Sequence, residues 1–187
     1  RRQRQMCIRD RWSAEALAEK DPQAMLTALL ALARTGEAEL QPKILARLNT
    51  LDWQGLDIAQ RAELLRVYQL AFIRMGKPSV ADAAAVEKKL DAVFPAPVNL
   101  LNYELVTLLV YLESPNVIAK TLKLLAQSTD QSKYDWAQSL LARNAGYGRA
   151  FAAAAASPPQ RDQIHYAKEL RNLTKHWTKD QRLEYFR

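Results

Sequence analysis

The feature that most constrains the fold of this chain is an internal repeat at an offset of forty residues. The segment LLALARTG at residues 29–36 returns as QLAFIRMG at residues 69–76, with a leucine, an arginine and a glycine at equivalent positions. A third segment, LVYLESPN at residues 109–116, keeps the apolar positions but has serine and asparagine in place of the arginine and the glycine. A period of this length is typical of stacked helical repeats.

Each repeat has the pattern of a longer helix followed by a shorter one. In DPQAMLTALLALART, Asp21 is suited to the N-cap, Pro22 to the first helical position and Gly36 to the end of the helix. The apolar residues between them recur at the three-and-four spacing of one helix face. The same signals predict further helices at residues 38–51, 58–76, 79–94, 98–114, 116–128, 162–174 and 179–186.

The sequence lacks the alternation of apolar and polar residues that marks a half-buried strand. We therefore expect an all-α chain, and more specifically an α-solenoid of HEAT-like antiparallel helix pairs that forms a single domain over residues 12–187. A plain helical bundle is the alternative. The segment at residues 132–157 interrupts the period, and we expect two short helices there, at residues 136–141 and 149–156, on either side of RNAGYG at residues 143–148.

The first eleven residues, RRQRQMCIRD followed by Arg11, differ from the rest of the chain. They hold five of the 27 basic residues, one of the 20 acidic residues and the only cysteine, Cys7. Translated back into DNA, they match the adapter of a transposon-based sequencing library. We therefore interpret residues 1–11 as an artefact and the chain as a fragment of a longer protein; a basic nucleic-acid-binding arm is the alternative. The remaining residues carry 22 basic and 19 acidic side chains, so the net charge falls from +7 to +3.

The candidate chemical groups do not form a catalytic constellation. His165 and His176 lie eleven residues apart without a cysteine or an obvious third ligand, so we expect no metal site. The G-x-G at residues 146–148 lacks the lysine of a phosphate loop. Glu104 and Glu113 lie on one expected helix, and we expect Glu104 to pair with an arginine of a neighbouring repeat. We thus expect no catalytic, cofactor-binding or metal-binding residue, and no enzyme activity.

The aromatic residues and the charge bear on the type of partner. We expect Trp53, Trp136, Trp177 and Tyr185 to fill gaps between repeats, because they are not interleaved with a basic groove as in a base-stacking surface. A sequence pI of about 9.6 nevertheless leaves nucleic-acid binding as an alternative. We expect no membrane segment, because charged residues interrupt every apolar run, and no signal peptide follows the basic start.

Three strings carry a resemblance to a known family: LLVYLESPNVIAKTLKLL, LLARNAGYGRAF and QIHYAKELRNLTKHWTKDQRLEYF. They resemble the HEAT-like region of very large exported proteins of planctomycete and related bacteria, and the similarity covers residues 21–187. In that family the region lies between an N-terminal propeller similar to sugar dehydrogenases and a C-terminal c-type cytochrome, a haem-binding domain. Lys175 and His176 depart from the pattern, which has a glycine before Trp177.

The resemblance implies a non-catalytic scaffold or protein-interaction module that links the domains of an exported, periplasmic redox protein. The partner would be another domain of the same chain, or a protein bound on the concave surface. Haem c is implied only for a downstream domain, because its CxxCH attachment motif does not occur in this sequence. A nucleic-acid-binding HEAT domain is the alternative, and a solenoid enzyme with Glu104 in its groove is a third hypothesis.

Overall fold

The computed structural model describes residues 11–127 and 160–186, and all regular structure in these residues is helical. The expectation of an all-α chain is therefore confirmed. Residues 11–18 form a first helix, which is followed by α2 (Pro22–Thr35), α3 (Gln41–Thr50), α4 (Ile58–Met75), α5 (Val80–Val93), α6 (Asn99–Tyr111), α7 (Val117–Gln127), α10 (Arg161–Leu170) and α11 (Lys179–Tyr185). Short 3-10 helices at Ala38–Leu40 and Trp53–Gly55 precede α3 and α4. The helices expected at residues 136–141 and 149–156, with RNAGYG between them, lie outside the described residues.

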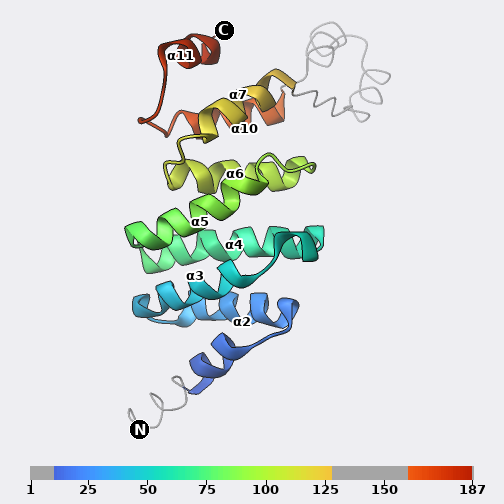
Figure 1. Ribbon diagram of the computed structural model, residues 1–187, viewed down its shortest axis with the longest axis vertical. Helices are drawn as coiled ribbons and strands as arrows, with labels where there is room; N and C mark the ends of the chain where they lie inside the picture. Colours follow the sequence, from blue (N-terminus) through green and yellow to red (C-terminus); the bar gives the residue numbers. More distant parts are fainter. Residues whose placement is uncertain (1–10, 128–159, 187) are drawn as a thin grey trace, which may run out of the picture.

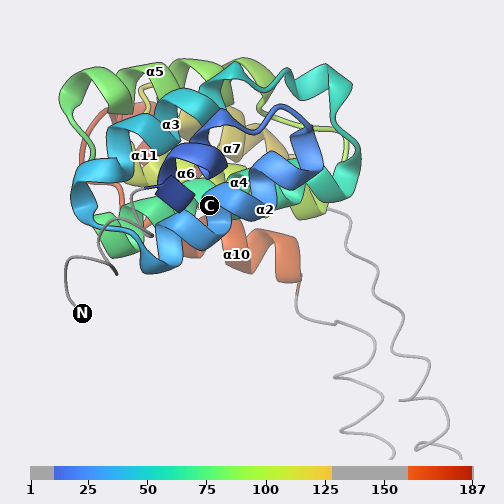
Figure 2. The ribbon, with the colours of Figure 1, turned by 90° about the horizontal axis from the view of Figure 1, so that it is seen from below.

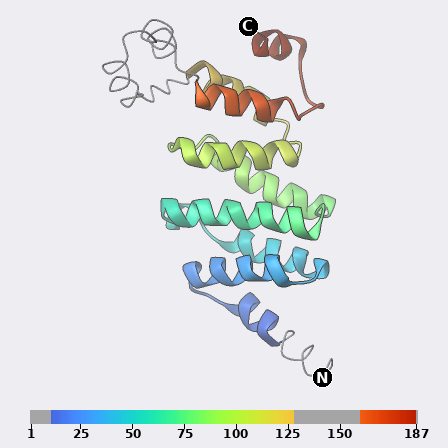
Figure 3. The ribbon, with the colours of Figure 1, turned by 180° about the vertical axis from the view of Figure 1, so that it is seen from behind.

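The helices stack along one long axis in the order of the chain (Figure 1). Seen along that axis they form two layers (Figure 2). One, which we call the A layer, contains α2, α4, α6 and α10, and each of these packs against the next (Figure 3). The other, the B layer, contains α3, α5, α7 and α11. The helices from α2 to α7 thus alternate between the layers along the axis.

The helix starts follow the local capping signals. Asp21 caps α2 by accepting a hydrogen bond from the N–H of Ala24 at 2.9 Å, and Pro22 occupies the first helical position, as predicted. At α4, Asp57 and Gln60 form a reciprocal capping box. These caps satisfy N–H groups that have no partner inside the helix.

Two predicted helix ends were wrong. The helix expected at residues 162–174 ends four residues early, at Leu170. We expected the helix of the third repeat to continue to Ser114, but α6 ends at Tyr111. Glu113 lies beyond that end with a φ of 55°, which is outside the helical region. Glu104 and Glu113 therefore do not share a helix, and Glu113 belongs to a turn.

The A-layer part of the core is built from positions that repeat with a slightly shorter period than the sequence echo. The echo at an offset of forty is seen at the helix ends, where Arg34 and Arg74 are both exposed and Gly36 and Gly76 both follow the last turn. The buried positions of α2 recur in α4 at an offset of 39 residues and in α6 at a further 37 residues. These positions are Met25, Leu26, Leu29, Leu32 and Ala33 in α2, Leu64, Leu65, Tyr68, Ala71 and Phe72 in α4, and Leu101, Asn102, Leu105, Leu108 and Leu109 in α6.

An amide-to-carboxylate hydrogen bond joins each A-layer helix to the next. Gln23 of α2 donates to Glu63 of α4 at 2.8 Å, and Gln69 of α4 donates to Glu104 of α6. At the third junction Asn99 of α6 donates to Asp162 of α10 at 3.0 Å. A hydrogen bond to a charged group is stronger than a neutral one, so these contacts help to fix the register of neighbouring helices.

Basic side chains play the corresponding role in the B layer, where each reaches the end of the preceding helix. Arg47 of α3 donates to the carbonyl of Glu19, just after the first helix. Lys89 of α5 donates to three carbonyls at the end of α3, at 2.6 to 3.2 Å. Partial burial lowers the pKa of Lys89 to about 8, which leaves it mostly charged at neutral pH. Cations at a helix C-terminus satisfy free carbonyls and complement the helix dipole.

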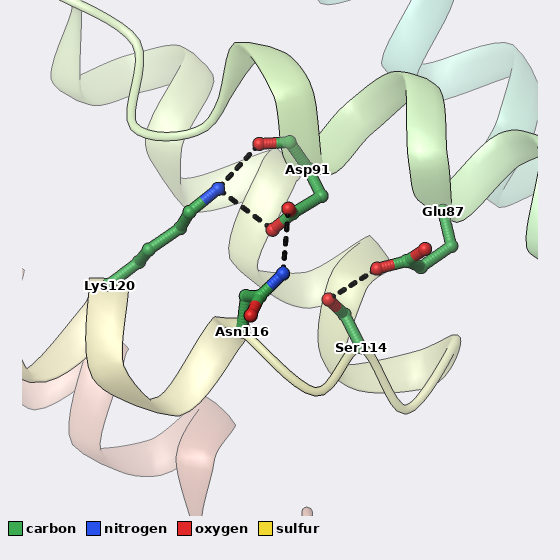
Figure 4. A network of polar contacts seen from close by, with 5 residues as sticks. All are labelled: Glu87, Asp91, Ser114, Asn116 and Lys120. Atoms are coloured by element: carbon green, nitrogen blue, oxygen red, sulfur yellow. Dashed lines mark hydrogen bonds and ion pairs between the residues drawn. The ribbon is translucent and has the colours of Figure 1, made fainter.

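The same arrangement at the end of α5 is drawn in Figure 4. Lys120 of α7 donates to the carbonyl of Asp91 at 2.6 Å and to its carboxylate at 2.8 Å. Asn116 donates to the second carboxylate oxygen at 3.0 Å. The fully buried Ser114 donates to Glu87 of α5 at 2.7 Å. This network ties the turn between α6 and α7 to the helix pair before it.

The two glycines of the sequence echo are needed for different reasons, which gives a first prediction. Gly76 has a φ of 91°, which side-chain-bearing residues rarely adopt, whereas a Cβ at Gly36 would lie 2.6 Å from the carbonyl oxygen of Leu32. We expect Gly76→Ala and Gly36→Ala each to lower the free energy of unfolding by about 1–3 kcal/mol. In the control Gly55→Ala the nearest atom lies 3.7 Å from the added Cβ. Urea denaturation should show little change for this control, and an equal loss for all three variants would contradict the explanation.

A second prediction concerns alkaline pH. Tyr68 is fully buried and its hydroxyl donates to Asn49 at 2.6 Å, and burial raises the pKa of Tyr68. In the unfolded chain a tyrosine loses its proton near pH 10, so the stabilisation is fully present below that pH and is lost as the pH rises above it. We expect the wild type to lose up to about 1.4 kcal/mol per pH unit relative to Tyr68→Phe above pH 10. Parallel stability curves for the two proteins between pH 9 and 11.5 would show that Tyr68 does not titrate in this way.

Candidate interaction site

The candidate site is a hollow of about 350 Å³ at the C-terminal end of the stack. It lies between the end of α10, the turn that follows and α11, the terminal helix in Figure 1. Its lining combines aliphatic, aromatic and cationic side chains with one threonine: Leu170, Arg171, Leu173, Thr174, Trp177, Arg182, Tyr185 and Phe186. Pockets of this volume, with an apolar lining and a few polar groups, are typical of ligand-binding sites.

The walls of the hollow are fixed by hydrogen bonds to the backbone. Trp177 donates from its indole nitrogen to the carbonyl of Leu173 at 2.8 Å, and the hydroxyl of Tyr185 donates to the carbonyl of Ala167 at 2.9 Å. Thr178 and Gln181 form a capping box that starts α11 directly after Trp177. The polar ends of both aromatic side chains are thus used internally, which leaves their rings to form the walls.

The turn that forms one side of the hollow is anchored on the preceding repeat. Lys175 forms an ion pair with Glu113 at 2.7 Å, from one turn to the other. The hydrogen bond from Lys175 lowers the pKa of Glu113, and the charges of Lys175, Lys77 and His176 add to this effect. Glu113 and His176 both have a positive φ, of 55° and 67°. Unusual backbone of this kind persists where the surroundings hold it in place.

Two arginines give the hollow its charge. Arg171 follows the end of α10 and Arg182 lies on α11, and both side chains are exposed. Neither forms an ion pair within residues 11–127 and 160–186. The hollow therefore offers planar guanidinium groups, which match a carboxylate in geometry and charge.

Apolar groups continue from the hollow onto the surface. The rings of Trp177 and Tyr185 lie edge to face at 5.4 Å, and those of Tyr185 and Phe186 at 5.0 Å. Phe186 is 83% exposed and Leu183 is 54% exposed. Large apolar side chains that gather at one place on a surface are typical of binding sites.

A second hollow, of about 510 Å³, lies on the other side of Tyr185, between α7, α10 and α11. Its lining is mainly aliphatic, with Gln163 and Glu184 as its polar side chains. The amide of Gln163 already donates to the carbonyl of Leu125 at 3.2 Å. This hollow therefore has fewer groups with which to recognise a ligand than the hollow at Trp177.

The two histidines lie in different parts of the structure, His165 in a cluster between α6 and α10 and His176 in the turn before α11. His165 is half-buried, with its ring 4.6 Å from that of Tyr103 and its Nε2 3.3 Å from the Tyr103 carbonyl. In the same cluster Tyr103 and Asn99 donate to the buried carboxylate of Asp162. His176 lies in the turn beside Glu113. The two histidines are thus parts of different contacts, and the described residues contain no group of three potential metal ligands.

The residue type predicted for the partner of Glu104 was wrong. We expected an arginine of a neighbouring repeat, but Glu104 accepts from the amide of Gln69. Gln69 lies on α4 and Glu104 on α6, so the contact does join neighbouring helices of the A layer. Residue types alone do not distinguish these partners, since an amide and a guanidinium can both donate to a carboxylate.

The expectation for the aromatic residues is met only in part. Trp53 is buried in the core, with the guanidinium of Arg61 over its ring at 5.4 Å. Trp177 and Tyr185 pack against the core with one side and line the hollow with the other. Trp136 lies outside the described residues. The pairing of Trp177 with Arg171 and Arg182 was not recognised in the sequence, although all three occur within twelve residues.

Comparisons of the chain with protein-family models, with curated proteins and with solved structures found no match. Within the described residues, no helix is both long enough and apolar enough to cross a membrane.

Proposed function

We propose that this chain is a non-catalytic scaffold module, an α-solenoid of HEAT-like antiparallel helix pairs that binds another protein domain. The observation that carries this proposal is the regular joining of successive helix pairs, by amides to carboxylates in the A layer and by cations to carbonyls in the B layer. In repeat proteins, such nearest-neighbour contacts supply much of the stability. A frame held in this way presents a binding surface that is already ordered before the partner arrives.

The use made of the candidate catalytic groups supports the same proposal. Glu104 accepts from Gln69, and His165 contacts the carbonyl of Tyr103, so both side chains serve junctions between helices. A catalytic acid or base has to reach a substrate in a pocket. The hollow at Trp177 contains neither of these side chains, and its charged groups are arginines.

The proposed context is an exported redox protein, in which this module lies between a propeller and a c-type cytochrome. This context rests on the resemblance carried by three strings of the sequence, of which QIHYAKELRNLTKHWTKDQRLEYF is the last. The partner would then be one of those domains, in the periplasm. Haem would be held by the cytochrome domain, with no contribution from the residues of this chain.

Sequencing the genomic region on both sides of the coding segment tests this context. We expect one reading frame that contains a CxxCH motif downstream and a propeller upstream. A frame with neither of them would contradict the redox context and leave the helical scaffold to be judged separately. The same sequence would show whether residues 1–11 belong to the gene.

Nucleic-acid binding is the competing function, and it makes a different prediction. Residues 12–187 carry a net charge of only +3, so we expect weak binding to a fluorescent 20-base-pair DNA duplex. Micromolar affinity with a steep loss on raising the salt concentration would favour the competing function, because phosphate contacts release counterions.

A further inference from the structure

The hollow at Trp177 has two kinds of recognition group at fixed places. Its floor contains Leu170 and Leu173, which are buried, and its walls contain the rings of Trp177 and Tyr185. Arg171 and Arg182 reach it from different elements, the turn after α10 and helix α11. An apolar centre with cations beside it is complementary to an apolar group with carboxylates beside it.

We propose that this hollow binds an acidic peptide segment of a partner protein, which inserts one large apolar side chain and places carboxylates against Arg171 and Arg182. This inference rests on the proposed function and names the chemistry of the partner. The inserted side chain packs on the aliphatic floor and between the rings. Each flanking carboxylate accepts hydrogen bonds from one guanidinium, in the paired geometry that arginine favours.

The site is ready to bind without rearrangement. Trp177 and Tyr185 are held by hydrogen bonds to the carbonyls of Leu173 and Ala167, and the turn is held by the ion pair of Lys175 with Glu113. Groups that are fixed in advance lose less entropy on binding. Phe186, with 83% of its surface exposed, would be covered by the peptide backbone on one side of the hollow.

The shape and charge of the site favour a peptide over a nucleic acid. A single-stranded nucleic acid binds best to exposed ring faces along a basic groove. Here Trp177 and Tyr185 are half-buried and lie edge to face, and the hollow holds about 350 Å³, room for a single large side chain. Glu113, which faces the turn of the site, is already paired with Lys175, whereas Arg171 and Arg182 form no ion pair within the described residues.

Fluorescence anisotropy with a designed probe tests the inference. The probe is a fluorescein-labelled peptide of sequence Asp-Glu-Phe-Asp-Glu with amidated C-terminus, added to the whole chain. Two control peptides replace the phenylalanine by alanine, or all four acids by their amides. We expect micromolar binding of the probe and a loss of about tenfold or more for each control peptide.

Variants of the chain locate the site. We expect the double variant Arg171→Gln/Arg182→Gln to bind the probe at least about tenfold more weakly, while Arg161→Gln, an exposed arginine at the start of α10, retains wild-type affinity. Circular dichroism confirms that each variant is folded. Equal binding by the double variant and the wild type overturns the inference, as does tighter binding of a labelled oligothymidine that competes with the probe. Either result would leave the helical scaffold and its redox context standing, because neither depends on what this hollow binds.

Discussion

Leu65→Ala is expected to lower the free energy of unfolding by about 3 kcal/mol. Leu65 lies in the middle of α4, is fully buried, and belongs to the core that α4 shares with its A-layer neighbours α2 and α6. Removing most of the side chain loses its burial and leaves a cavity that packed helices cannot fully close. Urea denaturation followed by circular dichroism at 222 nm measures the effect.

A control on the same helix separates burial from helix content. Ile73 also lies on α4, but 79% of its surface is exposed. We expect Ile73→Ala to change the free energy of unfolding by less than about 0.5 kcal/mol. Comparable losses in the two variants would mean that α4 does not pack as described.

The second large effect is expected at Asn102, where Asn102→Ala should cost about 3 kcal/mol. Its side chain is 1% exposed, accepts from the N–H of Ala96 at 2.7 Å and donates to the carbonyl of the same residue at 2.8 Å. The substitution leaves a buried donor and a buried acceptor without partners, and each costs about 1–3 kcal/mol. These two hydrogen bonds fasten the chain between α5 and α6 to the start of α6.

Asn172 provides the matched control for this substitution. It is exposed in the turn after α10, so Asn172→Ala should stay within about 0.5 kcal/mol of the wild type. Thermal denaturation of both variants gives the comparison. A small effect at Asn102 would show that water or a shifted backbone replaces its two hydrogen bonds.

Much of the helical pattern could be predicted because the signals are local. Asp21 and Pro22 specify the start of α2 through hydrogen bonding and a fixed φ, and neither effect depends on distant residues. The apolar spacing likewise specifies which face is buried. The end of α6 was placed three residues late because Glu113 adopts a positive φ, in a turn that the N–H groups of Glu113 and Ser114 close by donating to the carbonyls of Val110 and Leu109. Glycine usually occupies such a position, so a glutamate there does not signal a helix end in the sequence.

The exact period of the core illustrates the same limit. The sequence echo at an offset of forty residues identifies helix ends. The buried positions of α2 and α4 are instead related by an offset of 39, because burial depends on which side of α4 packs against α2. A helix turns by about 100° per residue, so a shift of one residue changes which side chains are covered. Leu26 is buried while Arg66, forty residues later, is exposed.

The candidate site was harder to predict than the fold. Trp177 and Tyr185 were recognised as packing residues, and one side of each does pack. The hollow beside them depends on the path of the turn from Arg171 to Trp177, which the hydrogen bond to Leu173 and the ion pair to Glu113 determine. The ion pair joins residues 62 positions apart, and such a contact leaves no periodic pattern in the sequence.

Hydrogen exchange measured by mass spectrometry on the wild type and Leu65→Ala tests the central claim most directly. In a solenoid each helix pair contacts its neighbours, so damage to α4 should reach the adjacent repeats first. We predict that protection falls most in α4 and in the helices that contact it, α2, α3 and α6. We predict a much smaller loss of protection in α10 and α11. An equal loss of protection in α4, α10 and α11 would contradict the stacked-repeat account and favour a single cooperative bundle.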